Sequence, residues 1–262
     1  MTTESVRVAA IIPARMASSR FPGKPLLPVL GLPMVEHVRR RALLSRCFSE
    51  VVVATCDPQI AHVIEGYGGR CLMTSPSHPG ATDRVAEAMQ QLECTHVVNV
   101  QGDEILVLPE DVARMVGAMT DEPEAPAWNA VAPLECPEEL GDRAIVKCAL
   151  SAAGAVMFCS RDFSHLAAHL QPDCEPIQKI LGILGYRRDF LERYLRLPRT
   201  PLEMAEGIDQ SRIIEHGIML KGVRFSRGYP GINEPREVAV VEAYLSQDAH
   251  QRLAVGTVLD AP

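Results

Sequence analysis

Residues 11–26 read IIPARMASSRFPGKPL, and this stretch indicates the fold more strongly than any other part of the chain. It begins at the end of an apolar strand over residues 6–12, which we expect to break at Pro13 before a loop of small residues. Residues 31–35 then open a helical pattern. In α/β sheets, a buried strand that runs into a loop beside a helix start is where phosphate groups bind.

Three cations in that loop, Arg15, Arg20 and Lys24, are candidates for binding phosphate oxygens through charge-assisted hydrogen bonds. Because like charges so close together repel one another unless an anion is present, we prefer this interpretation to a solvated basic loop. The loop is neither a Walker A motif, since Pro25 follows Gly23-Lys24, nor the dinucleotide glycine fingerprint. The sequence therefore predicts a phosphate site of another kind.

The distribution of charge supports a small anionic ligand. The net charge of −7 argues against nucleic acid as a partner, since binding a phosphate backbone requires an excess of positive charge. The positive charge is instead local, because residues 15–46 hold many cations against the single acid Glu36. These cations are Arg15, Arg20, Lys24, Arg39, Arg40, Arg41 and Arg46.

Strands and helices alternate in the first half of the chain. Apolar runs predict strands over residues 6–12, 50–55, 70–74 and 95–100, and helical spacing predicts helices over 34–45, from Asp57-Pro58 to about 66–69, 82–93 and 109–119. Such βαβα order predicts an α/β fold with a doubly wound parallel sheet and ligands at the carboxyl ends of its strands.

The second half has a different character. An acidic, linker-like loop over 121–126 precedes expected strands over 127–134, 145–150, 155–160 and 179–186, which look mixed or antiparallel, and helices over 201–216 and 234–245. A chain of 262 residues suits one α/β domain with an appended lobe.

The eight cysteines show no metal-binding spacing, and no apolar run is long enough to span a membrane. We expect free thiols, no membrane association and a cytoplasmic location.

A second chemical signal is VVNVQGDE over residues 97–104, an apolar strand that ends in Gly102-Asp103. Gly102 would let the backbone approach a ligand closely, and Asp103 would lie at the edge of the sheet. Mg²⁺ usually bridges a protein carboxylate to substrate phosphates, so Asp103 is a candidate magnesium ligand. The alternative is a carboxylate that caps the following turn.

A third signal is HPGATDR over residues 78–84. Thr82 can cap the following helix, and Gly80-Ala81 leaves room for a base or a ribose. Taken alone, this segment is a helix start, and we interpret His78 as a surface loop histidine rather than a catalytic one.

Together these segments resemble the CMP-Kdo synthetases, cytidylyltransferases that activate a sugar acid with CTP. The resemblance extends from Val8 to about Leu245 and implies a doubly wound, nucleotide-diphosphosugar-transferase-like sheet with an inserted dimerisation lobe. It also implies a single cytidylyltransferase domain over 1–262, with a nucleotide-binding half over 1–120, an acceptor-binding and dimerisation lobe over 121–230 and a C-terminal helical return over 231–262. Its motifs are IPAR (12–15), RFPGKPL (20–26), TDR (82–84), NVQGDE (99–104), VK (146–147), SR (160–161), LGI (181–183) and GYR (185–187).

The resemblance further implies roles for individual residues. Arg15, Lys24 and Asp103 would be catalytic, Asp103 and Asn233 would bind Mg²⁺, and acceptor and nucleotide would each have their own contacts. The nucleotide contacts would be Ala14, Arg15, Ser19, Arg20, Lys24, Thr82 and Arg84, and the acceptor contacts Gln101, Arg161, Asp209 and Gln210.

Three positions depart from the family pattern. The family's acceptor-site His and Tyr are Ile180 and Leu184 here, and its second metal aspartate is Asn233. An unpartnered buried hydroxyl costs about 1–3 kcal/mol, so the two apolar residues favour a small, strongly anionic acceptor such as a phosphonate. The phosphonoformate cytidylyltransferases are relatives of that kind. The alternative is a Kdo-like sugar acid that is contacted by other residues.

The implied activity is a magnesium-dependent transfer of CMP from CTP to an acidic acceptor with release of pyrophosphate, by a homodimer. Two alternatives stay open at this point. One is a nucleotidyltransferase of other base specificity that acts on a sugar phosphate, and the other is a non-catalytic nucleotide-binding regulatory protein.

Overall fold

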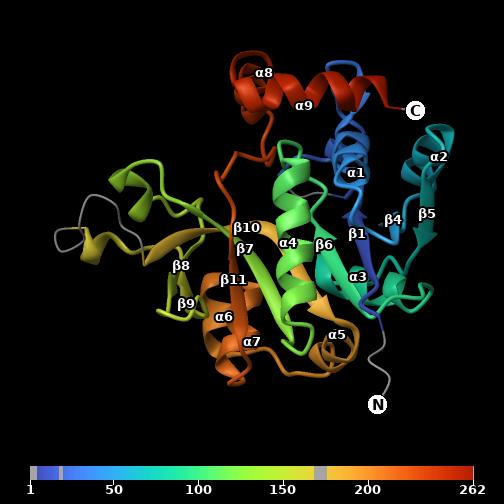
Figure 1. The fold of residues 1–262 in the computed structure, drawn as a ribbon. Helices are drawn as coiled ribbons and strands as arrows, with labels where there is room; N and C mark the ends of the chain where they lie inside the picture. The colour runs from blue at the N-terminus through green and yellow to red at the C-terminus, as the bar shows by residue number, and fades with distance from the viewer. Residues whose placement is uncertain (1–4, 18–19, 168–175, 262) are drawn as a thin grey trace.

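A nine-stranded sheet lies at the centre of the computed structural model, which describes residues 5–17, 20–167 and 176–261 (Figure 1). Two further strands extend one end of β10: β8 (Lys147–Leu150) pairs with β10, and β9 (Val156–Ser160) pairs with β8. The main path runs β11 (Leu220–Arg224), β7 (Ala127–Pro133), β10 (Ile177–Arg187), β6 (His96–Val100), β1 (Val8–Ala14), β4 (Glu50–Thr55) and β5 (Arg70–Met73).

The direction of the strands changes in the middle of the sheet. β1 pairs in parallel with β4 and β6, and β4 pairs in parallel with β5. β10 instead runs antiparallel to both β6 and β7. The expected parallel first half and mixed second half are therefore both confirmed.

Helices cover both faces of the sheet, so the expected doubly wound arrangement is confirmed. Side chains alternate along the strands: Ile12, Val53 and Val98 face one core, and Ile11, Val52 and Val97 face the other. The first core takes side chains from α1 (Met34–Leu44), α2 (Pro58–Gly66), α4 (Pro109–Asp121), α8 (Glu237–Gln247) and α9 (Ala249–Asp260), and the second from α3 (Ala81–Met89), α5 (Arg188–Tyr194) and α7 (Asp209–Glu215), on which α6 (Pro201–Glu206) packs.

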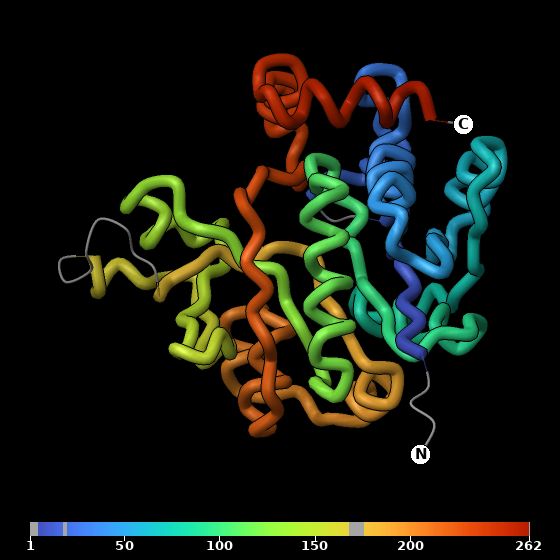
Figure 2. The backbone as a smooth tube through the Cα atoms, in the orientation of Figure 1, coloured from blue at the N-terminus to red at the C-terminus, as the bar shows by residue number. Residues whose placement is uncertain are grey.

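The two ends of the sequence pack together in space. In Figure 2 the C-terminal helix α9 crosses α1, the first α-helix of the chain. Arg40 Nη1 on α1 donates to the carbonyl oxygen of Val258 on α9 at 2.9 Å. The last helix therefore stabilises the nucleotide-binding half suggested by the sequence.

The expected break at Pro13 is wrong, because β1 continues through Pro13 to Ala14. The pairing of β1 with β6 ends at Ile11, so among the described strands only β4 pairs with β1 at Pro13. A missing N–H is tolerated where a strand has become an edge.

The expected cap by Thr82 is also wrong. The N-cap of α3 is Gly80, Thr82 lies inside the helix, and the helix ends at Met89, before the predicted residue 93. Some short elements carry too little pattern to be predicted: α5, β11, the hairpin of β2 (Pro28–Val29) and β3 (Leu32–Pro33), and the 3₁₀ turns η1 (Lys24–Leu26), η2 (Pro137–Leu140) and η3 (Ser164–Leu166). The helix α9 lies within the C-terminal helical return that the resemblance implied over 231–262, although the sequence pattern located a helix only over 234–245.

The seven cysteines within the described ranges are free thiols, as expected. In that part of the chain no helix is both long and apolar enough to cross a membrane.

Candidate functional site

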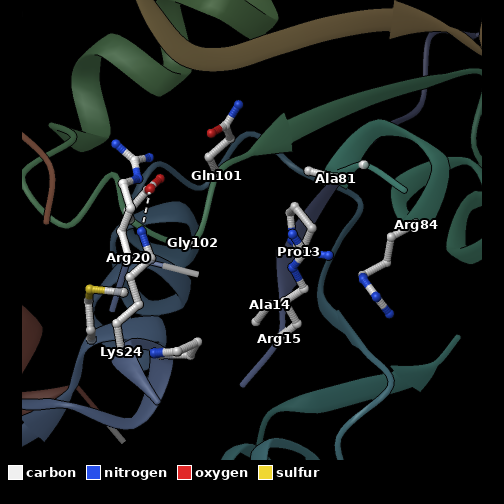
Figure 3. A pocket seen from close by; sticks show the side chains of 13 residues that line it. Pro13, Ala14, Arg15, Arg20, Lys24, Ala81, Arg84, Gln101 and Gly102 are labelled. Carbon is white, nitrogen blue, oxygen red and sulfur yellow. Dashed lines mark hydrogen bonds and ion pairs between the residues drawn. The ribbon is translucent and has the colours of Figure 1, made fainter. Parts of the chain in front are cut away.

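A cavity of about 230 Å³ lies at the carboxyl ends of β1 and β6, where the sequence predicted a phosphate site. Arg20 and Lys24 lie on one side of the Pro13–Arg15 segment, and Ala81 and Arg84 lie on the other (Figure 3). The lining consists of Pro13, Ala14, Arg15, Arg20, Lys24, Pro25, Met34, Gly80, Ala81, Arg84, Gln101, Gly102 and Asp103.

Positive charge dominates this first cavity. Four cations, Arg15, Arg20, Lys24 and Arg84, line it against one carboxylate, that of Asp103. Lys24 Nζ donates to Asp103 Oδ2 at 2.7 Å and to the carbonyl oxygen of Ile232 at 2.9 Å. The net charge of the lining suits a polyanion such as a triphosphate.

Arg84 differs from the other cations because it is buried. Its guanidinium donates to Thr74 Oγ1, and no carboxylate of the described residues forms an ion pair with it. A buried cation without a carboxylate is costly unless a ligand supplies negative charge. The predicted nucleotide contacts Ala14, Arg15, Arg20, Lys24 and Arg84 thus come together, whereas Ser19 lies outside the described residues.

The structure shows why residue 102 is a glycine, which the sequence did not reveal. A Cβ atom at this position would lie 2.9 Å from the carbonyl oxygen of Pro13. The glycine therefore allows the loop after β6 to pack on the end of β1, and this contact brings Asp103 next to Lys24. The sequence predicted that the backbone at Gly102 would approach a ligand closely, and in the structure it approaches the backbone of Pro13 instead.

A second cavity of about 700 Å³ opens beside the first. The two cavities meet at three polar side chains that line both of them, those of Arg20, Gln101 and Asp103. Thr82 also lines this larger cavity rather than the smaller one, and its hydroxyl lies against the buried Tyr186. Two ligands could therefore react at the junction of the cavities.

The predicted acceptor contacts Gln101, Arg161, Asp209 and Gln210 all line the second cavity. Arg161 Nε donates to the carbonyl oxygen of Glu206 at 2.9 Å, and Nη1 donates to that of Arg143 at 3.0 Å. No side-chain carboxylate in the described ranges forms an ion pair with this guanidinium. Arg161 is thus oriented by neutral groups while its charge stays available to an anion.

Asp209 is the one acidic side chain among these four predicted contacts. Burial raises the pKa of its carboxyl, and the nearby charge of Glu203 adds to the rise. The fold therefore disfavours the negative charge at this position relative to that of a fully solvated aspartate.

The two apolar departures lie on β10. Leu184 is 2% exposed and belongs to the second core, and Ile180 packs against the same core from the cavity wall. The pairing of β10 with β7 shifts between these two positions, so the strand bulges at the cavity. The wall that these residues form is apolar, as the sequence predicted.

Asn233 lies close to Asp103 despite their separation in sequence. Its Oδ1 accepts a hydrogen bond from Arg20 Nη2 at 3.1 Å, and a Cβ on Gly231 would lie 2.8 Å from the carbonyl oxygen of Asp103. The described residues contain no cluster of three or more His, Cys, Asp or Glu side chains suited to a metal ion. Asp103 and Asn233 together still fit Mg²⁺, which commonly takes one or two protein oxygens and completes its shell with phosphates and water.

The arginines of α1 do not belong to the site, so the single basic region expected over residues 15–46 is wrong. Arg39 Nε and Arg40 Nε donate to the Glu36 carboxylate at 2.6 and 2.7 Å. Arg41 Nη1 donates to the carbonyl oxygen of Val107, and burial lowers the pKa of Arg41 to about 10. These cations are buried in the packing around α1 and do not face the cavity.

Two residues that shape the larger cavity, Glu104 and Lys147, lie in the quoted motifs but received no role from the sequence. Glu104 Oε1 accepts a hydrogen bond from the Gly182 backbone N–H at 2.7 Å, and burial together with Asp103 raises the pKa of its carboxyl to about 7. Lys147 Nζ donates to the carbonyl oxygens of Asp142, Ile145 and Arg161, which fixes the cavity wall. A signal for Lys147 existed, since a lysine in an apolar strand needs buried partners.

The chain resembles known cytidylyltransferases along most of its length. The family model described as "Cytidylyltransferase" matches residues 9–224. The chain is 40% identical to the 3-deoxy-manno-octulosonate cytidylyltransferase of Myxococcus xanthus, over 92% of this chain and 98% of that protein. It is 34% identical to the enzyme of the same name from Escherichia coli, over 92% and 97% of the two chains.

Solved structures agree with these matches. The structure of CMP:2-keto-3-deoxy-manno-octonic acid synthetase in complex with CTP superposes with a TM-score of 0.85 and 33% identity, over 92% of this chain and 99% of that one. A 4-diphosphocytidyl-2C-methyl-D-erythritol synthase from Anaerococcus prevotii shares the fold at 14% identity and a TM-score of 0.64.

Proposed function

The chain belongs to the cytidylyltransferase family, among the CMP-Kdo synthetases, and on this premise we propose that it transfers CMP from CTP to a 2-keto sugar acid of the Kdo type. It is a CTP-dependent nucleotidyltransferase. This assignment is preferred to the two alternatives that the sequence left open, another base specificity and a non-catalytic regulatory protein. The observation that carries the proposal is the junction of the two cavities at Arg20, Gln101 and Asp103.

The proposed reaction is an in-line displacement. A hydroxyl oxygen of the acceptor attacks the α-phosphorus of CTP, and its proton passes to solvent. The bond from that phosphorus to the oxygen that bridges it to the β-phosphate breaks, and pyrophosphate leaves. Arg15, Arg20 and Lys24 stabilise the charge of the departing pyrophosphate. Binding both ligands at the junction supplies orientation, and we assign no protein nucleophile.

Asp103 and Asn233 are the residues that would hold Mg²⁺. When bound there, the ion supplies positive charge to the phosphate oxygens. Lys24 occupies one oxygen of Asp103 and leaves the other for the metal. Asn233 contributes an amide oxygen and no charge, so we expect the metal to depend strongly on the nucleotide's phosphates.

Arg161 supports an acidic acceptor, because its guanidinium is oriented but has no carboxylate partner among the described residues. The cavity of about 700 Å³ is within the range of ordinary small-molecule sites and is large for a compact phosphonate. A small phosphonate stays a second candidate on one observation, the apolar wall at Ile180 and Leu184.

We also propose that the protein is a two-fold homodimer that pairs through the lobe over residues 121–230. Met157 and Phe158 on β9 are 55% and 41% exposed. Within the described ranges β9 forms a strand ladder only with β8, and the bridge from Ala155 to Lys221 of β11 lies just before β9 begins. An exposed, apolar strand edge favours association. Sedimentation should give a dimer at micromolar concentration, and the Met157→Lys variant should shift it toward monomer.

Pyrophosphate release from CTP tests the proposed reaction, with Kdo, a nine-carbon keto acid and phosphonoformate offered side by side. We expect turnover with Kdo and stimulation by Mg²⁺. Turnover with phosphonoformate alone would replace the sugar acid with a small phosphonate and leave the cytidylyltransferase assignment intact. No pyrophosphate release with any of the three acceptors would contradict the proposed function.

A further inference from the structure

Asn129 on β7 is a fully buried amide behind the acceptor cavity. Its Nδ2 donates to the carbonyl oxygen of Ala130 at 2.8 Å and to that of Leu181 at 3.0 Å. Its Oδ1 accepts from Gln210 Nε2 at 2.8 Å. Because both carbonyl oxygens can only accept, the orientation of the Asn129 amide is determined by its partners.

The orientation of Asn129 determines that of Gln210. Only the amino group of Gln210 can donate to Asn129 Oδ1, so Gln210 Nε2 is directed toward β7. Gln210 lines the acceptor cavity, and its Oε1 has no hydrogen-bond partner among the residues that the structure describes. Gln210 therefore leaves Oε1 to a ligand as a hydrogen-bond acceptor, beside the second proton of Nε2.

We infer that Asn129 is a positioning residue that holds Gln210 with Oε1 toward the acceptor, so that the site selects a substrate hydroxyl which donates a hydrogen bond there. The inference rests on the proposed function and deepens it. Arg161 offers donors to an anionic group, and Gln210 offers an acceptor to a hydroxyl. A fully ionised compact phosphonate has no hydroxyl to donate, so this pair of contacts favours a hydroxylated acid.

The same contacts connect Gln210 to the junction of the two cavities. Leu181, which accepts from Asn129, precedes Gly182 in the bulge of β10. The Gly182 N–H donates to Glu104, and the Gly182 carbonyl oxygen accepts from the Gln101 N–H at 2.9 Å. Asn129 therefore sets the position of Gln210 relative to Gln101, which borders both cavities.

Analogues of the acceptor test the direction of this hydrogen bond. In Kdo, each hydroxyl other than the one whose oxygen attacks the α-phosphorus is replaced in turn by hydrogen or by fluorine, which cannot donate. At one position we expect both replacements to lower kcat/KM by about tenfold, as the loss of one buried hydrogen bond does. The loss should fall on the KM for the acceptor, and the KM for CTP should not change. A fluoro analogue that keeps most of the activity which its deoxy counterpart loses would overturn the inference.

Variants of the protein assign the effect to Gln210 and Asn129. In Gln210→Met the analogue and its parent should react at similar rates. In Asn129→Leu the discrimination should fall, because the amide of Gln210 is no longer held. The matched control is Asn99→Leu on β6, another fully buried Asn, whose amide has no partner in the described structure and whose loss should leave the discrimination unchanged. Unchanged discrimination in Gln210→Met would contradict the assignment, and that variant decides the matter if Asn129→Leu does not fold.

A readout without turnover separates this inference from the proposed function. In protein labelled with ¹⁵N at glutamine side chains, the signal absent from Gln210→Met is that of Gln210. Its Nε2 protons should exchange slowly with solvent, and about tenfold faster in Asn129→Leu. If no sugar acid reacts but this protection is seen, the proposed function fails and the positioning by Asn129 stands. Fast exchange in the unmodified protein would overturn the positioning whatever the substrate.

Discussion

Two groups of cations lie close together in the sequence and have opposite roles in the structure. Those of the loop, Arg15, Arg20 and Lys24, line a cavity and face one carboxylate. Those of α1, Arg39 and Arg40, are buried against the carboxylate of Glu36. The difference shows that a local excess of positive charge indicates a ligand site only where the cations line a cavity, and not where they are buried in helix packing.

The largest effect is expected from Lys24→Ala, which removes a cation from the loop. Without it, the charge that develops on the departing pyrophosphate loses a direct partner, so kcat should fall by about 10³-fold or more. The melting temperature should change little, because the loss of the part-buried ion pair with Asp103 is offset by weaker repulsion among the cations that line the cavity. Steady-state kinetics and a thermal melt together measure both quantities.

The matched control is Lys221→Ala on β11. Lys221 Nζ forms an ion pair with Glu122 at 2.6 Å, outside both cavities, so its loss should leave kcat unchanged. If the two variants have similar activity, the loop cations are not the groups that stabilise the leaving pyrophosphate.

For Glu36→Ala on α1 we expect the opposite pattern, a large loss of stability and little effect on nucleotide binding. This variant leaves two buried guanidinium groups without their carboxylate, which costs about 3–5 kcal/mol of unfolding free energy. Any protein that still folds at low temperature should bind CTP normally, because Glu36 lies outside the cavities. Denaturant titration measures the loss. Glu93→Ala is the control, since its 90% exposed side chain forms a surface pair with Arg7 worth at most about 1 kcal/mol.

The loop site was predictable because its signals are local. Apolar runs located β1 and β6, and neighbouring parallel strands end at the same edge of a sheet, so Lys24 and Asp103 had to lie near each other. The family resemblance supplied Asn233 and Arg161, which carry no such signal of their own.

The remaining features depend on contacts between distant segments. Nothing near Asn129 in the sequence indicates that Gln210 donates to it, or that β10 bulges between Ile180 and Leu184. The counterion of the helix arginines was visible as Glu36, yet their burial by α9 was not. Periodicity identifies which residues are apolar, and it does not identify which helix will cover a charged face.

Glu104 extends the comparison to a negative group in a site dominated by cations. Burial raises the pKa of its carboxyl to about 7 in the folded state, from the ordinary 4.5. The folded protein therefore holds the proton more tightly than the unfolded chain does. The stability that this contributes is complete below about pH 4.5 and is lost as the pH rises through about 7, up to about 3 kcal/mol in total.

The Glu104→Gln variant isolates that contribution, because the glutamine carries no titrating proton. Between pH 4.5 and 7 the unfolding free energy of the unmodified protein should fall relative to that of the variant, as measured by urea titration at a series of pH values. Parallel curves over this range would show that the Glu104 carboxyl is ionised in the folded protein.

Arg161 represents a third arrangement, a cation oriented by neutral carbonyl oxygens and left for an anion. The Arg161→Met variant should raise the KM for the acidic acceptor by about 10- to 100-fold, since a hydrogen bond to a charged group contributes about 1.5–3 kcal/mol. The KM for CTP should stay the same, because Arg161 lines only the larger cavity.

Arg188→Met provides the comparison, because Arg188 Nη1 also donates to backbone carbonyl oxygens, those of Leu92 at 2.8 Å and Cys94 at 3.4 Å. Unlike Arg161, Arg188 also pairs with a carboxylate, that of Glu192 at 3.4 Å. Arg188 lies outside both cavities, so its loss should lower stability without changing either KM. An equal rise in acceptor KM in the two variants would mean that Arg161 acts through the shape of the cavity wall. A rise confined to Arg161→Met would instead show that a guanidinium held by carbonyl oxygens binds the acceptor where it lines the cavity and has no carboxylate of its own.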